Sequence, residues 1–159
     1  MRSLLFLLVL SLAADAQRVP DAVLHKTTPI PDRIILTWAD TPANSQAVNW
    51  RTDTSVAKSF GEIALSIAAP TFPAAAKRFE ATTTAFTSDL GDAHYHSINF
   101  TGLQPSTLYV YRVGDGLNWS EWNQFRTPAA NDAPLEFIYV GDAQNDIWQL
   151  WSRTIRQSV

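Results

Sequence analysis

Short stretches rich in β-branched and aromatic residues recur through the middle of the chain, and clusters of proline, glycine and asparagine separate them. In the stretch 94–100, His96, Ile98 and Phe100 occupy every second position, which is the period of a strand with one buried face. Seven stretches of this kind are predicted as strands: 34–38, 47–52, 62–67, 79–87, 94–100, 107–113 and 122–127. Seven short strands within about 100 residues predict an antiparallel β-sandwich.

The segment 103–109 has the sequence LQPSTLY and joins two of the predicted strands. Its proline predicts a turn, after which Tyr109, Tyr111 and Val113 share one strand face. A tyrosine at such a corner can bury its ring and return its hydroxyl to nearby backbone. This L-x-P-x-T-x-Y pattern resembles the fibronectin type III fold. Trp50 on the second strand is expected to fill the centre of the sandwich, and Trp38 is also assigned to the core.

The chain begins with a basic residue, Arg2, followed by the apolar run 4–10 and then by Ala14 and Ala16. This order predicts a secretory signal peptide cleaved after Ala16, and hence a secreted or periplasmic protein. The apolar run is too short to serve as a stable membrane anchor. The alternative is a buried N-terminal helix, but no polar position divides the run into two faces.

The pattern changes after residue 128. Small residues and proline over 129–134 predict a linker. The nearly continuous apolar run 135–140 is typical of a strand buried on both faces, and it ends in Gly141 and Asp142. From Ile147 onward, apolar residues recur at helical spacing. A strand, a turn and a helix in this order predict the opening of an α/β unit.

Asp142 follows the carboxyl end of that predicted strand, where open α/β sheets bind ligands. A carboxylate there is a hard oxygen ligand suited to magnesium, manganese or ferric iron. The alternative is an aspartate that caps the helix or shapes the turn. His94 and His96 are a second candidate metal pair. They are alternatively packing residues, because the only other histidine is His25.

The composition of the chain excludes several classes of function. A hydrophobic content of 46% with six tryptophans predicts a packed core, and a net charge of −3 predicts no nucleic-acid partner. The absence of cysteine excludes disulfides, thiolate metal sites and a cysteine nucleophile.

A signal peptide, a sandwich with the L-x-P-x-T-x-Y pattern, a linker and the sequence FIYVGD over 137–142 together resemble the purple acid phosphatase family. The resemblance covers the chain from about Pro31 onward, and includes the strand 96–103 before the tyrosine corner. The family has a fibronectin-like N-terminal domain followed by a metallophosphoesterase domain. Where the family has glycine two places after the motif aspartate, this chain has Gln144.

The resemblance implies hydrolysis of a phosphomonoester substrate by a dinuclear metal centre, of iron with zinc, manganese or a second iron, in the full-length protein. It implies that Asp142 is a metal ligand, and it assigns no other catalytic or cofactor-binding residue in this chain. No histidine follows His96, so the chain is expected to lack most of the catalytic domain and to be inactive alone.

The expected fold class is therefore mainly β, a fibronectin type III-like antiparallel sandwich followed by the first strand and helix of a truncated α/β domain. The expected domains are a signal peptide over 1–16, the sandwich over 17–128, the linker over 129–134 and the start of the metallophosphoesterase domain over 135–159. The expected function is that of the N-terminal part of a secreted metal-dependent acid phosphatase. The alternative is a non-enzymatic secreted module that binds a glycan or a protein, for which an exposed Trp119 or Trp122 would be the best support.

Overall fold

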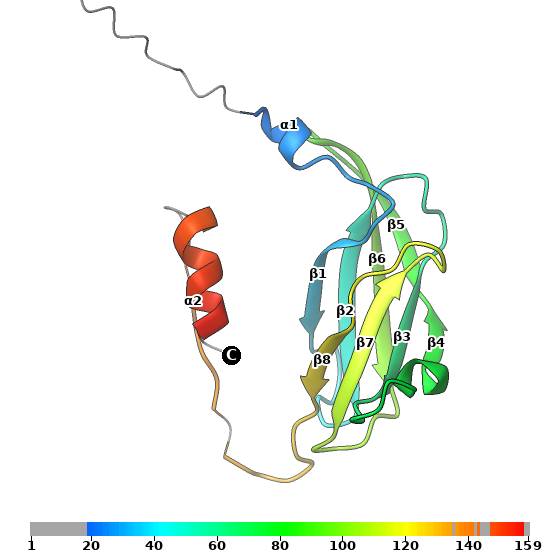
Figure 1. Cartoon of the computed structure of the whole chain (residues 1–159), viewed down its shortest axis with the longest axis vertical. Coiled ribbons are helices and arrows are strands. Elements are labelled where there is room, and N and C mark those ends of the chain that lie inside the picture. The colour runs from blue at the N-terminus through cyan, green and yellow to red at the C-terminus, as the bar shows by residue number, and fades with distance from the viewer. Residues whose placement is uncertain (1–18, 135, 142, 144–146, 158–159) are drawn as a thin grey trace, which may run out of the picture. The chain divides into compact units, whose positions relative to one another are not determined.

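Two antiparallel sheets dominate the computed structural model, which describes residues 19–134, 136–141, 143 and 147–157. Within these residues one sheet has the order β1-β2-β6-β5, and the other has the order β4-β3-β7-β8 (Figure 1). The first sheet comprises β1 (Asp32–Thr37), β2 (Ser45–Thr52), β6 (Gly91–Thr101) and β5 (Thr82–Ser88). The second comprises β4 (Lys77–Glu80), β3 (Phe60–Leu65), β7 (Leu108–Gly114) and β8 (Asn123–Arg126). Short helical turns form α1 (Asp21–Leu24) and η1 (Phe72–Ala75).

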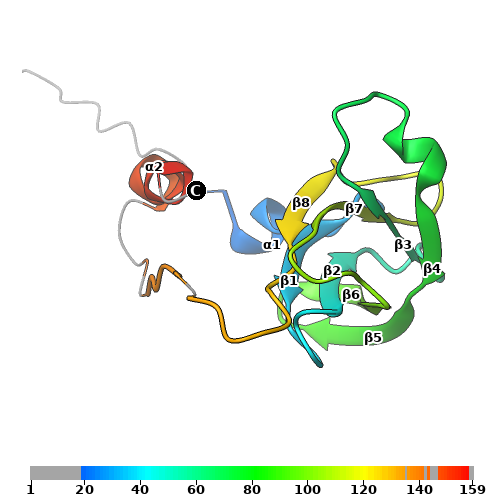
Figure 2. The ribbon, with the colours of Figure 1, turned by 90° about the horizontal axis from the view of Figure 1, so that it is seen from below.

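The two sheets face one another as layers and enclose a single core (Figure 2). Trp50 of β2 is fully buried at its centre, as predicted, together with Val48, Phe100 and Val113. The assignment of Trp38 to the core is wrong, because its side chain is 56% exposed. β1 ends at Thr37, so Trp38 lies beyond the last position at which the strand alternation directs side chains inward.

The stretch 79–87, predicted as one strand, forms parts of two strands in different sheets. β4 pairs with β3, and the N–H of Ala81 still donates to the carbonyl of Ser59, 2.9 Å away, next to β3. From Thr82 onward the chain pairs with β6 of the opposite sheet instead. The threonine-rich composition predicts an extended backbone over the whole stretch but does not specify its pairing partner. The chain therefore has eight sheet strands among the described residues where seven were predicted.

The tyrosine corner is confirmed. The backbone N–H of Gln104 donates to the hydroxyl of Tyr109, 2.9 Å away, and the Tyr109 ring is buried against Phe125. Pro105 and Ser106 form the turn, and Ser106 adopts a left-handed backbone conformation with φ of 51°. The hydroxyl thus ties the connection between β6 and β7 to the core-facing side of β7.

Residues 129–159 form a unit separate from residues 1–128. Helical structure begins at Ile147, as predicted, and comprises η2 (Ile147–Trp151) and α2 (Ser152–Gln157). The strand predicted over 135–140 is not formed among its described residues, 136–140. A strand requires a neighbour for its backbone hydrogen bonds, and the described part of this unit supplies none, so Tyr139 is 88% exposed. The predicted signal peptide, 1–16, lies outside the described residues, and no described helix is long and apolar enough to cross a membrane.

We expect Tyr109→Phe to lower the free energy of unfolding by about 1 kcal/mol, since it removes the acceptor for the Gln104 N–H while leaving the buried ring in place. Urea denaturation of the full chain, with an unchanged m-value, measures this loss. Tyr139→Phe is the matched control and should change nothing, because its side chain is exposed. Equal stability of the two variants would show that the corner hydrogen bond contributes nothing.

Candidate functional site

Asp142, the predicted metal ligand, lies outside the described residues, so its role stays a prediction. Within the described residues, no group of three or more histidine, aspartate, glutamate or cysteine side chains is arranged to hold a metal ion. The described part of the chain therefore does not fit a dinuclear metal centre.

His96, the better placed of the two candidate histidines, has hydrogen-bond partners on both ring nitrogens. Its Nε2 lies 2.8 Å from the Thr52 hydroxyl and its Nδ1 lies 2.9 Å from the Thr83 hydroxyl. The ring is 1% exposed and stacks on Trp50 with a centroid separation of 5.4 Å. His94 donates from Nδ1 to the carbonyl of Val56 at 2.8 Å. The packing interpretation of His96 is thus confirmed, and the ring lies deeper in the sandwich than its edge.

Burial of His96, reinforced by the neighbouring His94, lowers its pKa from 6.5 to about 4. The ring is therefore neutral at pH 7, where one nitrogen donates and the other accepts a hydrogen bond. The two threonine hydroxyls match either arrangement, because each can donate and accept.

Trp119 and Trp122 lie beside the outer face of the β4-β3-β7-β8 sheet, where both contact the same arginine. The guanidinium of Arg112, on β7, lies 4.3 Å from the ring centroid of Trp119 and 4.7 Å from that of Trp122. Arg78, on β4, lies 5.3 Å from the Trp119 ring and 5.5 Å from the ring of Phe60. Alternating cations and aromatic rings at these distances attract one another. We call these five residues and Glu62 the arginine–tryptophan cluster.

Glu62, on β3, joins the two arginines of this cluster. Arg78 donates to Oε1 at 2.9 and 2.7 Å, and Arg112 donates to Oε2 from Nε at 2.8 Å and forms an ion pair with it at 2.6 Å. Both arginines stand directly opposite Glu62 in the strand register. Burial raises the pKa of Glu62, but hydrogen bonds from Arg78 and Arg112 and their charges outweigh it, so the pKa lies below its ordinary value. Glu62 is thus an ionised carboxylate shared by two cations.

The cluster shows how far Trp119 and Trp122 are exposed, the feature that would support the alternative of a glycan- or protein-binding module. Both tryptophans are half-buried, and Arg112 lies over each ring. The ring of Trp122 also meets Phe72 edge to face at 5.1 Å. In the described structure the Trp119 and Trp122 rings therefore pack against Arg112, and Trp122 also packs against Phe72. The spacing of Trp119 and Trp122 in the sequence does not predict their contact with Arg112. The contact forms because Arg112 lies on β7, which pairs with β8, the strand that follows Trp122.

The described residues form a β-sandwich of two antiparallel four-stranded sheets with a tyrosine corner. Residues 31–127, more than half of the chain, match the model of the purple acid phosphatase N-terminal domain. The chain therefore belongs to this family through its N-terminal domain. No curated protein sequence matches the chain.

Several solved structures are similar to the chain. The fn3 domain of human contactin 1 has 16% sequence identity and a TM-score of 0.46, and the match covers 67% of this chain and 82% of that one. The third fibronectin III domain of human KIAA0343 protein has 12% identity and a TM-score of 0.43, with 69% and 90% covered. A computationally redesigned β-sandwich protein has 18% identity and a TM-score of 0.41, with 64% and 96% covered. At such identities these matches carry no information about activity.

We expect Glu62→Gln to lower the free energy of unfolding by about 2 to 3 kcal/mol, because it leaves two arginines without their shared charge. Glu80→Gln is the matched control, since Glu80 forms an exposed pair with Lys58 at 3.6 Å and should cost less than about 0.5 kcal/mol. Urea denaturation measures both losses. A cost for Glu62→Gln no larger than that of the control would show that the cluster is only a surface ion pair.

The lowered pKa of His96 predicts a loss of stability in mild acid. Below pH 6.5 the unfolded chain binds a proton on this ring that the native state does not bind until about pH 4. The free energy of unfolding should therefore be highest above pH 6.5 and should fall by about 2 kcal/mol between pH 7 and pH 5. His96→Gln should be less stable at pH 7 and should lose most of this pH dependence.

Urea denaturation at a series of pH values measures the effect. His25→Gln is the control and should retain the wild-type slope, because His25 lies before the first sheet strand. If His96→Gln kept the wild-type slope as well, the acid sensitivity would have to come from another group.

Proposed function

We propose that this chain is the N-terminal part of a secreted, metal-dependent acid phosphatase that hydrolyses phosphomonoesters. The observation that carries the proposal is the match of residues 31–127 to the purple acid phosphatase N-terminal domain. The order of the sequence supports it, because a proline-containing linker over 129–134 leads into an apolar run that ends in Gly141 and Asp142.

In this proposal the sandwich and the catalytic chemistry belong to different parts of the protein. A dinuclear metal centre would polarise the phosphoryl group and supply the attacking hydroxide. Asp142 would provide one oxygen ligand to it. The described residues do not fit the centre, and in this proposal the sandwich is a separate module, held together by its core and by the arginine–tryptophan cluster.

Export is part of the same proposal. Arg2, the apolar run 4–10 and the alanines at 14 and 16 have the order of a cleaved signal peptide. A chain without cysteine needs no oxidising folding machinery, and it is compatible with metals held by oxygen and imidazole ligands.

The test begins with the transcript downstream of codon 159. We expect a reading frame that encodes further histidine-containing and Gly-Asp motifs. The encoded protein should hydrolyse p-nitrophenyl phosphate and should lose this activity on treatment with a chelator. Asp142→Asn should reduce activity by at least a hundredfold, while the exposed linker variant Asp132→Asn should retain it.

The 159-residue chain alone should show no phosphatase activity. A locus without any such reading frame would overturn the proposal, and so would a longer product in which Asp142→Asn is fully active.

A further inference from the structure

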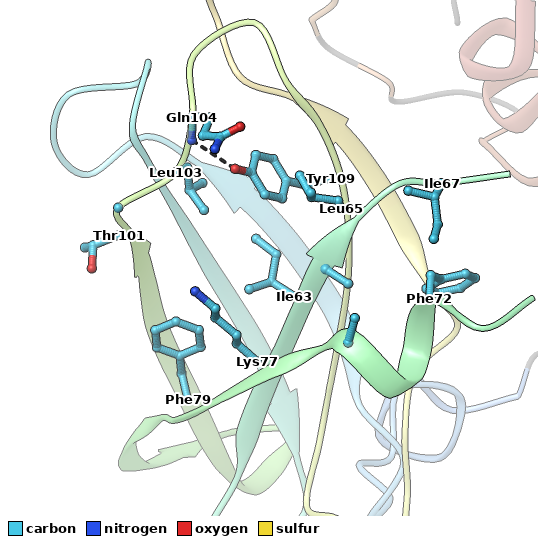
Figure 3. A pocket seen from close by; sticks show the side chains of 13 residues that line it. Ile63, Leu65, Ile67, Phe72, Lys77, Phe79, Thr101, Leu103, Gln104 and Tyr109 are labelled. Carbon is cyan, nitrogen blue, oxygen red and sulfur yellow. Dashed lines mark hydrogen bonds between the residues drawn. The ribbon is translucent and has the colours of Figure 1, made fainter. Parts of the chain in front are cut away.

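An apolar cavity opens between the two sheets, next to the tyrosine corner (Figure 3). Its volume is about 360 Å³, which lies within the range of small-molecule sites in proteins. Its walls come from β3, η1, β4 and the connection between β6 and β7. The larger apolar side chains that line it are Ile63, Leu65, Ile67, Phe72, Phe79 and Leu103.

The cavity is open to water, because part of its apolar lining is exposed. Leu65 is 49% exposed and Ile67 is 51% exposed, although both contribute to the cavity wall. Apolar surface that faces water in a concave site gains free energy when an apolar ligand covers it. The cavity therefore favours a ligand with a hydrocarbon portion.

Polar side chains lie at a few positions around the cavity: Lys77, Thr101, Gln104 and Tyr109, whose hydroxyl accepts a hydrogen bond from the Gln104 N–H. Lys77 stands opposite Ile63 in the strand register, so its stem projects from the sheet on the same side as Ile63. Figure 3 shows Lys77 and Phe79 extending together from β4 among the lining side chains. The cavity thus combines an apolar wall with one cationic group.

The charge of Lys77 is not neutralised by a neighbour. Among the described residues no carboxylate pairs with its ammonium group, whereas Lys58 pairs with Glu80 at the other end of β4 and Arg78 pairs with Glu62. An inward-pointing lysine on an edge strand such as β4 can also protect against unwanted strand addition. That role explains the position of Lys77 but does not explain an open cavity beside it.

We propose that this cavity binds a medium-chain alkyl carboxylate, with the hydrocarbon chain against Ile63, Leu65 and Phe79 and the carboxylate at Lys77. The ammonium group supplies the charge complement to the carboxylate. This inference goes beyond the proposed phosphatase function and does not depend on Asp142.

Titration of the full chain with sodium octanoate, followed by calorimetry and by two-dimensional NMR, tests the site. We expect saturable binding at one site, with shift changes centred on Ile63, Leu65 and Leu103. Hexanoate should bind roughly tenfold more weakly than octanoate, because two fewer methylene groups are buried. Octylamine, with the same chain and the opposite charge, should bind more weakly than octanoate.

Charge reversal provides the decisive comparison. Lys77→Glu should weaken octanoate binding at least tenfold and should make octylamine the better ligand. Lys58→Glu changes the net charge equally near the same edge but does not line the cavity, so it should leave both affinities unchanged. Lys77→Gln, which keeps an uncharged polar side chain, should show an intermediate loss for octanoate, and its circular dichroism should confirm that the sandwich remains folded.

Three results would each overturn the proposal. One is the absence of saturable octanoate binding. Another is equal affinity of the wild-type chain for octanoate and octylamine. The last is an equal loss of octanoate binding in Lys77→Glu and Lys58→Glu, which would indicate a general charge effect.

Discussion

The sandwich depends on the close approach of β3 to Phe100 in the opposite sheet. Gly61 makes this approach possible, since a Cβ atom at that position would lie 2.8 Å from the Phe100 ring. The ring itself is fully buried and meets Phe79 edge to face at 5.5 Å. A side chain at residue 61 would force the two layers apart, and the packing of Trp50 and Val113 in the same core would loosen with them.

Two buried polar residues, His96 beside Trp50 in the core and Glu62 on the outer face of the β4-β3-β7-β8 sheet, are satisfied in different ways. His96 stays neutral between two threonine hydroxyls, so its burial requires no counter-ion. Glu62 stays charged because two arginines hold it, and aromatic rings in turn flank those arginines. Among the described residues, no buried side-chain polar atom lacks a hydrogen-bond partner. Complete satisfaction of this kind offsets the desolvation penalty of burial, so that polar side chains can contribute to a unique packing.

The sequence predicts much of this fold because local patterns carry much of it. Alternation identifies His96, Ile98 and Phe100 as one buried face, and the structure buries all three. The proline turn before Tyr109 predicts the corner hydrogen bond, since its partner, Gln104, lies only five residues away. Trp50 is likewise placed in the core by its position on a strand. Each of these predictions rests on the two-residue alternation of a strand or on a short separation between two residues along the chain.

Pairing between distant segments was decided only by the tertiary structure. The change of sheets at Ala81, the exposure of Trp38 and the contact of Arg112 with both Trp119 and Trp122 all depend on which strands become neighbours. The cavity beside Lys77 has the same origin, because its walls come from separate strands and connections. The sequence by itself determined most of the strand positions, the inward faces that carry Trp50 and Phe100, and the family resemblance. The tertiary structure decided the partners of each face, because strand pairing depends on contacts among residues far apart in the chain, which no local pattern encodes.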